Sequence, residues 1–314
     1  MHLFEKDVWL VLASLVCCCG ICTPLVLSGL YKFPAKRYNV AASLMLCELM
    51  AEETQGGPQI PNVMHPSILK VIEQKKAIKE KLKGIKHKIG VYSAKGGVGK
   101  TTVSVNLAYT LKSMGFKVGL LDADIDCPNL TMFLGIKGTF SDEYPLKPVE
   151  KDGIKILSTA MFVDDEKKPI IWRGPMIGKM VLEFFDNADW GELDYLIIDL
   201  SPGTSDAPLS IIQLLDLDGF VLVTTPQHIA AVNTIRSGMM AKRLGVATLG
   251  VVETMSDGAA RGGKEVAEAM KCDLLGTISN NPKFGELSDA GRVPVEEDPV
   301  IREEFIRIIK KITG

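Results

Sequence analysis

The sequence lacks an excess of charge of either sign. It has 36 Lys and Arg residues against 38 Asp and Glu residues, which gives a formal net charge of −2. A chain with this balance has no global basic surface, so we expect no nucleic-acid partner. Hydrophobic residues make up 46% and charged residues 24% of the 314 positions, a composition that excludes wholesale disorder. The sequence contains neither an internal repeat nor a low-complexity segment.

Cysteine is scarce beyond the N-terminal region. Five of the seven cysteines lie in the first 47 residues, and the other two, Cys127 and Cys272, share no spacing motif. No disulfide framework is apparent, which fits a reducing compartment. Cys19 and Cys22 form a C-x-x-C pair, a spacing that suits metals or redox chemistry. They lie in an apolar run, however, where cysteine also serves as a small apolar side chain.

Residues 1–60 form an N-terminal region that differs from the rest of the chain. Its segment from Val8 to Leu30 has no charged residue and, at about 20 residues per span, is long enough to cross a bilayer. Lys32, Lys36 and Arg37 follow, and the positive-inside rule would then leave the remaining chain in the cytoplasm. Four interpretations stay open: a membrane anchor, translated sequence upstream of the true start, a cleaved signal peptide, or a buried helix.

A basic helix is predicted over residues 67–88. It follows a Gly- and Pro-rich linker at residues 55–66, and Ile68, Val71 and Ile72 repeat at helical spacing among many lysines. Such a helix either has a solvated charged face or rests on an acidic membrane surface or partner.

From residue 89 to residue 314, short apolar runs alternate with helical patterns. Runs that are apolar throughout indicate strands buried on both faces, as in a parallel sheet. The alternation predicts an α/β domain with a doubly wound, mostly parallel sheet and helices on both faces, in which ligands bind beyond the carboxyl ends of the strands. The expected strands are 89–92, 118–122, 154–157, 195–199, 219–224, 249–252 and 274–278. The expected helices include 100–114, 176–185, 230–243, 264–270 and a closing helix at 299–313.

A glycine-rich loop joins the first of these strands to the first helix. Glycines without side chains let the backbone N–H groups wrap a phosphate, and the following helix directs its positive end at the same anion. Lys100 can reach the β- and γ-phosphates, and the Thr101 hydroxyl can ligate magnesium. The sequence therefore predicts an ATP and Mg²⁺ site. The candidate nucleotide-binding residues of this loop are Lys95, Gly96, Gly97, Val98, Gly99, Lys100, Thr101 and Thr102.

Two further strands end in carboxylates. The strand at 118–122 leads into Asp122, Asp124 and Asp126, and the strand at 195–199 ends in Asp199. Carboxylates at these ends can face a magnesium-bound phosphate and position water. Asp199 follows four apolar residues, which is a Walker B pattern. The turn at residues 201–204 comes next and can respond to a γ-phosphate as switch segments do.

These segments together resemble the deviant-Walker ATPases of the MinD, ParA and nitrogenase-iron-protein class, and within it the Mrp/ApbC branch of iron–sulfur cluster carriers. The resemblance covers about residues 85–314. WRGPM together with SPGTSD separates this branch from MinD and ParA. The matching motifs are KGGVGKTT at 95–102, LLDADIDCPN at 120–129, WRGPM at 172–176, DYLIIDLSPGTSD at 194–206, VTTPQ at 223–227, GVVETMS at 250–256 and LLGTI at 274–278.

The resemblance implies a Mg²⁺-dependent, homodimeric, cytoplasmic ATPase with apo iron–sulfur proteins as clients. It explains why the loop carries two lysines: Lys95 would reach across the dimer to the partner's phosphates, as an arginine finger does. Lys100 would hold the β/γ-phosphates, Thr101 the magnesium, and Asp199 the metal through water. Asp124 matches the residue that activates water. Asp122 is expected to support the same site, also as a metal ligand.

The chain departs from the branch at the cluster ligands. The branch normally carries a C-P-x-C pair shortly after the segment that is here ETMS, and two protomers bridge one cluster through those cysteines. No such pair follows residue 256, and Cys272 stands alone downstream. Because thiolates hold iron–sulfur clusters, cluster binding at the usual position is not supported by this sequence.

Further departures concern the base and the switch turn. Related ATPases have Asn at the position of Thr254, where its amide reads adenine. Threonine lacks an amide's paired donor and acceptor, so nucleotide selectivity is either relaxed or supplied by backbone groups. Ser201 and Ser205 stand where the branch usually has Pro and Gly.

Three functions are therefore compared. The first is an ATPase of iron–sulfur cluster assembly or transfer. The alternative is an ATP-dependent positioning or partner-regulating switch of the MinD/ParA type without a cluster. The third is a nucleotide-dependent interaction module that does not hydrolyse, against which the intact lysines and aspartates argue.

Overall fold

The computed structural model describes only part of the chain. The described residues are 76–124, 127–136, 147–162, 188–204, 208, 211, 212, 215 and 217–314. The chain divides into two units, residues 1–69 and 70–314, and every described residue belongs to the second. The apolar segment Val8–Leu30 and the expected helix at 176–185 lie outside the described residues. Within the described part of the chain, no helix is both long and apolar enough to span a membrane.

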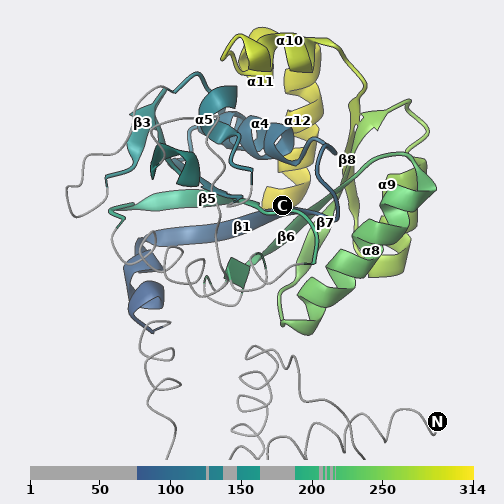
Figure 1. Cartoon of the computed structure of the whole chain (residues 1–314), viewed down its shortest axis with the longest axis horizontal. Coiled ribbons are helices and arrows are strands. Elements are labelled where there is room, and N and C mark those ends of the chain that lie inside the picture. The colour runs from purple at the N-terminus through teal and green to yellow at the C-terminus, as the bar shows by residue number, and fades with distance from the viewer. Residues whose placement is uncertain are drawn as a thin grey trace, which may run out of the picture. The chain divides into compact units, whose positions relative to one another are not determined.

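An eight-stranded sheet forms the centre of the domain (Figure 1). Its strand order is β3-β4-β2-β5-β1-β6-β7-β8, and all neighbouring pairs are parallel apart from the antiparallel pair β3 and β4. The strands are β1 (Ile85–Ser93), β2 (Val118–Ala123), β3 (Val149–Lys151), β4 (Ile154–Ser158), β5 (Leu193–Leu200), β6 (Gly219–Thr224), β7 (Thr248–Ser256) and β8 (Leu274–Ser279).

Helices cover both faces of this sheet, as Figure 1 shows for α4 and α12 on one side and α8 and α9 on the other. The described helices are α4 (Lys100–Ser113), α5 (Leu130–Phe133), α8 (His228–Arg243), α9 (Arg261–Met270), α10 (Lys283–Asp289), α11 (Pro294–Glu297) and α12 (Pro299–Thr313). Short 3-10 helices are η2 (Leu82–Gly84) and η3 (Thr159–Phe162). The predicted doubly wound α/β fold is confirmed.

The core has two halves, one on each face of the sheet. Successive residues of a strand point to opposite faces, so each central strand contributes to both halves. In β6, Phe220 and Leu222 pack with α8 and α9, whereas Val221 and Val223 pack with α4 and α12. All six residues of β6 and of β2 are buried. This double burial is why these strands are apolar throughout.

β1 begins at Ile85, earlier than the predicted start at Ile89. Residues 85–88 are therefore strand, and the prediction of a basic helix over the whole of 67–88 is wrong at its C-terminal end. This stretch pairs with the first residues of β5 while its lysines stay exposed or half-buried. Pairing with a neighbouring strand overrides the local preference. Residues 76–81 are helical, as predicted.

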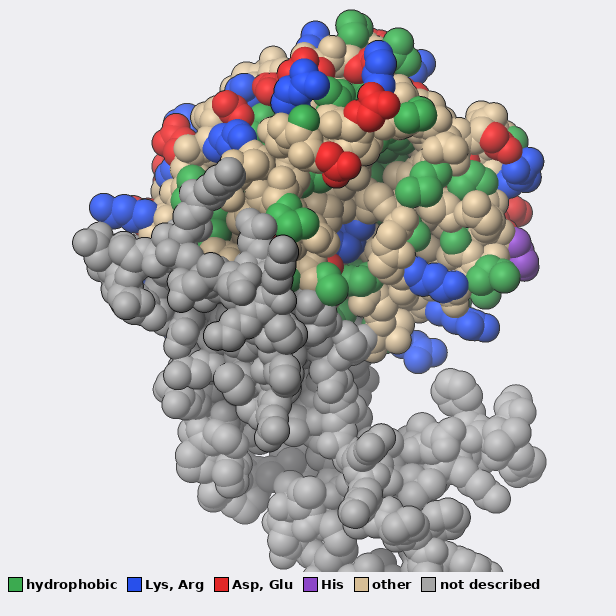
Figure 2. Space-filling view, turned by 45° about the horizontal axis from the view of Figure 1, so that its top comes forward, with side chains coloured by type: hydrophobic (Ala, Val, Ile, Leu, Met, Phe, Trp, Pro, Cys, Tyr) green, Lys and Arg blue, Asp and Glu red, His purple; other side chains and the backbone are tan. Residues whose placement is uncertain are grey.

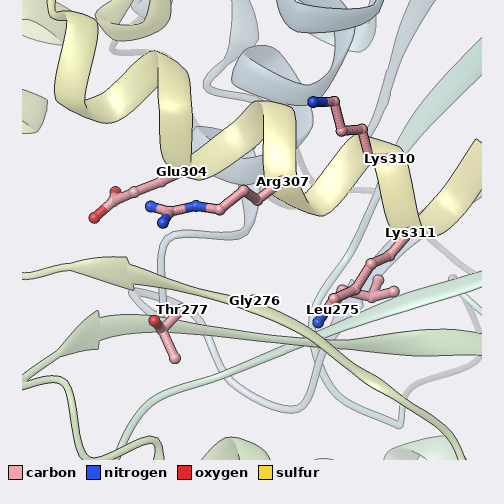
Figure 3. A pocket seen from close by; sticks show the side chains of 7 residues that line it. All are labelled: Leu275, Gly276, Thr277, Glu304, Arg307, Lys310 and Lys311. Atoms are coloured by element: carbon pink, nitrogen blue, oxygen red, sulfur yellow. The ribbon is translucent and has the colours of Figure 1, made fainter.

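The two edge strands of the sheet are both protected. β3 is only three residues long and antiparallel to β4, and two of its residues are exposed. It therefore has no apolar run by which it could be predicted. At the other edge, α12 packs beside β8 over a cavity of about 390 Å³ (Figure 3). Lys311 donates to the Leu274 carbonyl at 2.8 Å, and Glu304 accepts from the Ser279 amide at 3.2 Å. These side chains occupy backbone groups that an open edge would offer to another chain.

Basic and acidic side chains are interspersed on the face shown in Figure 2. This pattern agrees with the small net charge of the whole chain. On that face, charge of one sign therefore does not mark out a binding surface.

Candidate functional site

The P-loop (residues 94–99) leads from the end of β1 into α4. Gly97 and Gly99 have φ angles of 76° and 82°, in the left-handed region that favours glycine. Gly99 is the N-cap of α4, and no side chain caps the helix. The first N–H groups of α4 therefore have no side-chain acceptor and form an anion-binding end. The loop has the conformation that its glycines predict.

Lys100 is the first residue of α4 and is buried, with 6% of its surface exposed. Its Nζ lies 2.7 Å from Asp199 Oδ1 and 3.5 Å from Asp124 Oδ2. Burial acts to lower the pKa of Lys100, but Asp199 and Asp124 outweigh it, so the pKa stands above its ordinary value. Lys100 is therefore a buried cation held between two carboxylates.

Asp199 of β5 accepts hydrogen bonds from three side chains of α4. Besides Lys100, it accepts from the Thr101 hydroxyl at 2.6 Å and from the Ser104 hydroxyl at 2.9 Å. Ser104 was missed from the sequence, although it lies four residues after Lys100 and so shares its helix face. Thr101 and Asp199 supply the hard oxygen atoms that Mg²⁺ prefers.

The strand register brings the aspartates together. β5 lies between β1 and β2, and Asp122 of β2 is directly opposite Asp199 of β5. On its other side, Asp199 is opposite Val91, close to the end of β1. Parallel strands end at one edge of the sheet, so the P-loop and both aspartate-bearing strands meet there.

Asp122 is fully buried and its oxygens are occupied by the protein. They accept from the Asp124 amide at 3.1 Å, the Leu130 amide at 3.1 Å and the Ser158 hydroxyl at 3.0 Å. Burial, reinforced by the nearby Asp199, raises the pKa of Asp122 to about 7. These bonds fix the segment that carries Asp124.

Asp124 follows β2 directly, and 5% of its surface is exposed. Its Oδ1 accepts from the Cys127 amide at 3.2 Å, and its carbonyl accepts from the Thr159 hydroxyl at 3.3 Å. Burial raises the pKa of Asp124 above its ordinary value, although Lys100 acts in the opposite direction. A carboxylate with a raised pKa is a better proton acceptor. Asp126 lies outside the described residues.

The switch turn (residues 201–204) is held by the ends of β1 and β2. The Gly203 amide donates to the Ser93 carbonyl at 3.0 Å, and the Tyr92 hydroxyl donates to the Gly203 carbonyl. The Ser201 hydroxyl donates to the Ala123 carbonyl at 3.2 Å, and it also lowers the pKa of Asp124 by hydrogen bonding. The turn is thus in contact with the segment that bears Asp124.

Lys95 differs sharply from Lys100. Its side chain is exposed, and among the described residues it takes part in no ion pair. The Ser93 hydroxyl donates to its carbonyl at 3.0 Å, which fixes the backbone and leaves the side chain in solvent. The structure therefore places one lysine of the loop inside the site and the other outside it.

Thr254 lies at the end of β7, and 3% of its surface is exposed. Its hydroxyl is 2.6 Å from the Val98 carbonyl and 3.0 Å from the Thr224 carbonyl. The side chain predicted to face the base therefore contacts the P-loop and β6.

The connection between β7 and α9 occupies the position at which the branch carries its cluster ligands. It comprises only residues 257–260 and is closed by an ion pair of 2.6 Å between Asp257 and Arg261. A Cβ on Gly262 would lie 2.1 Å from the Thr225 carbonyl oxygen, so α9 begins hard against the end of β6. The connection is thus short, and the helix that follows it packs closely against the end of β6.

The two described cysteines differ in exposure. Cys127 is exposed and Cys272 is half-buried, and burial together with Asp273 raises the pKa of the Cys272 thiol. Within the described ranges, His, Cys, Asp and Glu form no group of three or more that could hold a metal ion. The WRGPM motif at 172–176 lies outside those ranges.

Comparisons with known proteins agree with this geometry. The chain is 42% identical over 264 residues to an iron–sulfur cluster carrier protein of Methanocaldococcus jannaschii, covering 79% of this chain and 91% of the relative. It is 39% identical over 252 residues to one of Aquifex aeolicus, covering 75% and 69% of the two chains.

Solved structures give the same picture. A nucleotide-binding protein of Archaeoglobus fulgidus in complex with ADP is 35% identical, with a TM-score of 0.61 over 74% of this chain and 95% of that chain. The septum site-determining protein MinD of Pyrococcus horikoshii, complexed with Mg-ADP, shares the fold at 23% identity and a TM-score of 0.58, over 73% and 98% of the two chains. A family model described as ParA, NUBPL iron-transfer P-loop NTPase, matches residues 84–313. This protein therefore belongs to the NUBPL iron-transfer P-loop NTPase family.

Proposed function

We propose that this protein is a homodimeric, Mg²⁺-dependent ATPase that acts in the cytoplasm in iron–sulfur cluster assembly or transfer to apoproteins. One observation carries the proposal. Lys100, Asp124 and Asp199 form a buried ion cluster beside the P-loop, in a chain 42% identical to an iron–sulfur cluster carrier. A module that binds nucleotide without hydrolysing it would not need these buried charged side chains, because burying charge is costly.

ATP hydrolysis would follow because bound phosphates change the contacts within this group of buried charged side chains. The N–H groups of the P-loop and of the α4 N-terminus would bind the β- and γ-phosphates. Lys100 would then neutralise phosphate oxygens in place of Asp124, which lies 3.5 Å from it. Released from that cation, Asp124 would accept a proton from the attacking water, a task that its raised pKa favours.

The residues present fit a magnesium ion. Thr101 and Asp199 offer a hydroxyl and a carboxylate 2.6 Å apart, with Asp199 expected to act through water. Bound magnesium would polarise phosphoryl oxygens and neutralise developing charge. Asp124 remains a candidate ligand as well as the base. Asp122 already accepts three hydrogen bonds from the protein, so we assign it the task of fixing the Asp124 segment.

Dimerisation would complete the site through Lys95. This lysine is exposed and has no ion-pair partner among the described residues, so it is available to a second copy of the chain. A cation supplied in trans stabilises charge on the transferred phosphoryl group and couples hydrolysis to assembly.

The iron–sulfur cluster would be the cargo of this protein, and its ligands would differ from the usual cysteine pair. The four-residue connection between β7 and α9 carries no thiol, so the candidates are Cys127, Cys272 and the five cysteines of the first 47 residues. Two copies of one such thiol, one from each protomer, would supply half of a four-thiolate ligand set.

Anaerobic reconstitution of the full chain with iron and sulfide tests this function. We expect visible absorbance, iron bound in proportion to dimer, and transfer to an apo-ferredoxin that speeds up or slows down on addition of ATP. Cys272→Ser and Cys127→Ser identify ligands within the described domain, and loss of iron in neither would point to the N-terminal cysteines. Iron-free protein with normal ATP hydrolysis would refute the cargo and leave the ATPase intact.

A second candidate is an ATP-dependent switch that regulates a partner without a cluster. The β7–α9 connection favours it, since this segment carries no cysteine and is bridged by the Asp257–Arg261 ion pair. Under this alternative the purified protein is colourless and ATP alters its dimerisation, measured by light scattering with ATP and with ADP.

A further inference from the structure

Thr254 makes contacts that base recognition does not require. A hydroxyl has one proton to donate, and the shorter of its two contacts is the one to the Val98 carbonyl, at 2.6 Å. The Thr254 methyl group faces Gly99, where an added Cβ would be 3.5 Å from Thr254 Cγ2. The hydroxyl therefore contacts Val98, and the methyl group faces Gly99, the last residue of the P-loop.

The Val98 carbonyl belongs to the same peptide unit as the Gly99 N–H. In a planar trans peptide these two groups point in opposite directions, so a donor that fixes the carbonyl also fixes the direction of the N–H. The bond to Thr254 polarises this peptide and makes its N–H a stronger donor. Gly99, with a φ of 82°, cannot hold this orientation by steric restriction of its own.

The strand that presents Thr254 is itself held firmly. The carboxylate of its neighbour Glu253 is fully buried and accepts from the Gly263 amide of α9 at 2.8 Å and from the Ser256 hydroxyl at 2.5 Å. The end of β7 is thus tied to α9 on one side, while Thr254 contacts the P-loop and β6 on the other. A hydroxyl held in place in this way is suited to positioning a glycine-rich loop.

We propose that Thr254 is a positioning residue of the P-loop: by donating to the Val98 carbonyl, it directs the Gly99 N–H toward the nucleotide phosphates. The proposal rests on the nucleotide binding proposed above. It also makes selectivity between bases independent of this side chain, because its hydroxyl is committed to protein carbonyls and 3% of the residue is exposed.

The test is ADP and GDP binding by calorimetry to the full chain and its Thr254→Val variant, which keeps the shape and removes the donor. We expect the dissociation constants of both nucleotides to rise by the same factor, about fivefold to tenfold, since the phosphates are common to both. The ratio of ADP to GDP affinity stays that of the wild type. Thr254→Ser keeps the donor and restores tight binding.

Thr110→Val is the matched control. Thr110 is buried, and its hydroxyl donates to a backbone carbonyl, that of Asn106, at 2.7 Å within α4 and away from the P-loop. It should lower the melting temperature as Thr254→Val does, yet leave nucleotide affinity unchanged. If Thr254→Val does not fold, Thr254→Cys serves instead, because cysteine is a weak donor of similar volume. Its affinity for ADP and GDP should be lower than that of Thr254→Ser.

Three results would overturn the proposal: unchanged ADP affinity in Thr254→Val, loss of affinity in Thr254→Ser equal to that in Thr254→Val, or a change in the ratio of ADP to GDP affinity. The last would restore base recognition to Thr254. If the wild-type chain binds neither nucleotide, the proposed function itself fails, and this outcome is visible before any variant is measured.

Discussion

Two regions at the carboxyl edge of the sheet differ in how they use charge. Where β1, β5 and β2 end, Lys100, Asp199 and Asp124 are withdrawn from water and paired with one another. Where β7 joins α9, Asp257 and Arg261 form their ion pair with side chains 53% and 64% exposed. Exposed ion pairs contribute little to the free energy of unfolding, whereas removing one partner of a buried pair is strongly destabilising.

The contrast shows which half of the protein is constrained. The nucleotide half depends on a few buried charges at fixed positions. Its lysines and aspartates match the family resemblance, whereas Thr254 and Ser201 stand where the branch usually has Asn and Pro. The β7–α9 half is a short surface connection with an exposed ion pair. Five substitutions test this difference.

Lys95→Ala should have the largest effect. If Lys95 completes the partner's site, its loss should slow ATP hydrolysis by about 10³-fold or more, while ADP affinity changes little. Phosphate release assays and calorimetry measure the two quantities. Lys264→Ala removes an exposed lysine from the β7–α9 region and should leave hydrolysis unchanged. Normal hydrolysis in Lys95→Ala would refute the role in trans.

Asp124→Asn should come next. The amide is the same size but cannot accept the proton of the attacking water, so the rate constant of hydrolysis should fall by about 10²- to 10⁴-fold. Single-turnover measurements separate this loss from binding. Asp257→Asn, the matched change in the exposed region, should have no such effect. Equal rates for Asp124→Asn and wild type would mean that another group activates water.

Asp122→Asn should change how stability depends on pH. The native pKa of about 7 lies above the ordinary value of 3.8, so between them the native state holds more protons than the unfolded state. Wild-type stability is therefore lost as pH rises through this range, by at most about 1.4 kcal/mol per pH unit. The variant lacks this titration, so its stability relative to wild type should improve from pH 5 to pH 7 and then level off.

Urea unfolding of nucleotide-free protein at pH 5, 6, 7 and 8 measures this difference. Asp194→Asn is the control, because Lys86 holds the pKa of half-buried Asp194 below its ordinary value and the carboxylate stays ionised throughout. Its difference from wild type should be flat. A flat difference for Asp122→Asn would mean that this buried carboxyl is already ionised at pH 5.

Gly262→Ala tests how tightly the second region is packed. The added Cβ would lie 2.1 Å from the Thr225 carbonyl oxygen, so α9 would have to shift, at a cost of about 1–3 kcal/mol in unfolding free energy. Gly285→Ala in α10 is the control, since no atom lies within 4 Å of its added Cβ. That variant should gain up to about 1 kcal/mol from helix propensity. Similar effects at both sites would contradict the close contact.

The nucleotide half could be predicted from the sequence because its signals are local. A buried parallel strand is an apolar run, and the loop glycines, Lys100 and Asp199 stand at fixed places beside such runs. Contacts that depend on strand order could not be predicted in this way. Ser158 meets Asp122 only because β4 lies beside β2, and Thr254 reaches Val98 only because β7 ends near the P-loop.

The edge strand of the sheet and the start of β1 were also not predicted correctly from the sequence. The short strand β3 has no apolar run, and residues 85–88 carry lysines that favoured a helix in the sequence. Both become strands because a neighbouring strand offers its backbone groups. Local propensity cannot report a partner that lies far away in the chain.

Ser201→Ala should have the smallest effect, and it removes a hydrogen bond between the switch turn and the segment that bears Asp124. The Ser201 hydroxyl donates to the Ala123 carbonyl at 3.2 Å and lowers the pKa of Asp124. Without it the pKa of Asp124 rises further, so the base is protonated at a higher pH. The acid limb of the pH profile of hydrolysis should therefore move to higher pH by a few tenths of a unit, about half a kcal/mol.

Ser113→Ala is the matched control, because its hydroxyl also donates to a backbone carbonyl, that of Thr110 at 2.7 Å, but at the far end of α4. Its pH profile should coincide with that of the wild type. A shift of the Ser201→Ala profile toward lower pH would mean that the hydroxyl opposes ionisation of Asp124. In that case the serine, which stands where the branch usually has proline, would raise the pKa of Asp124 and make it a stronger base that is ionised over a narrower pH range.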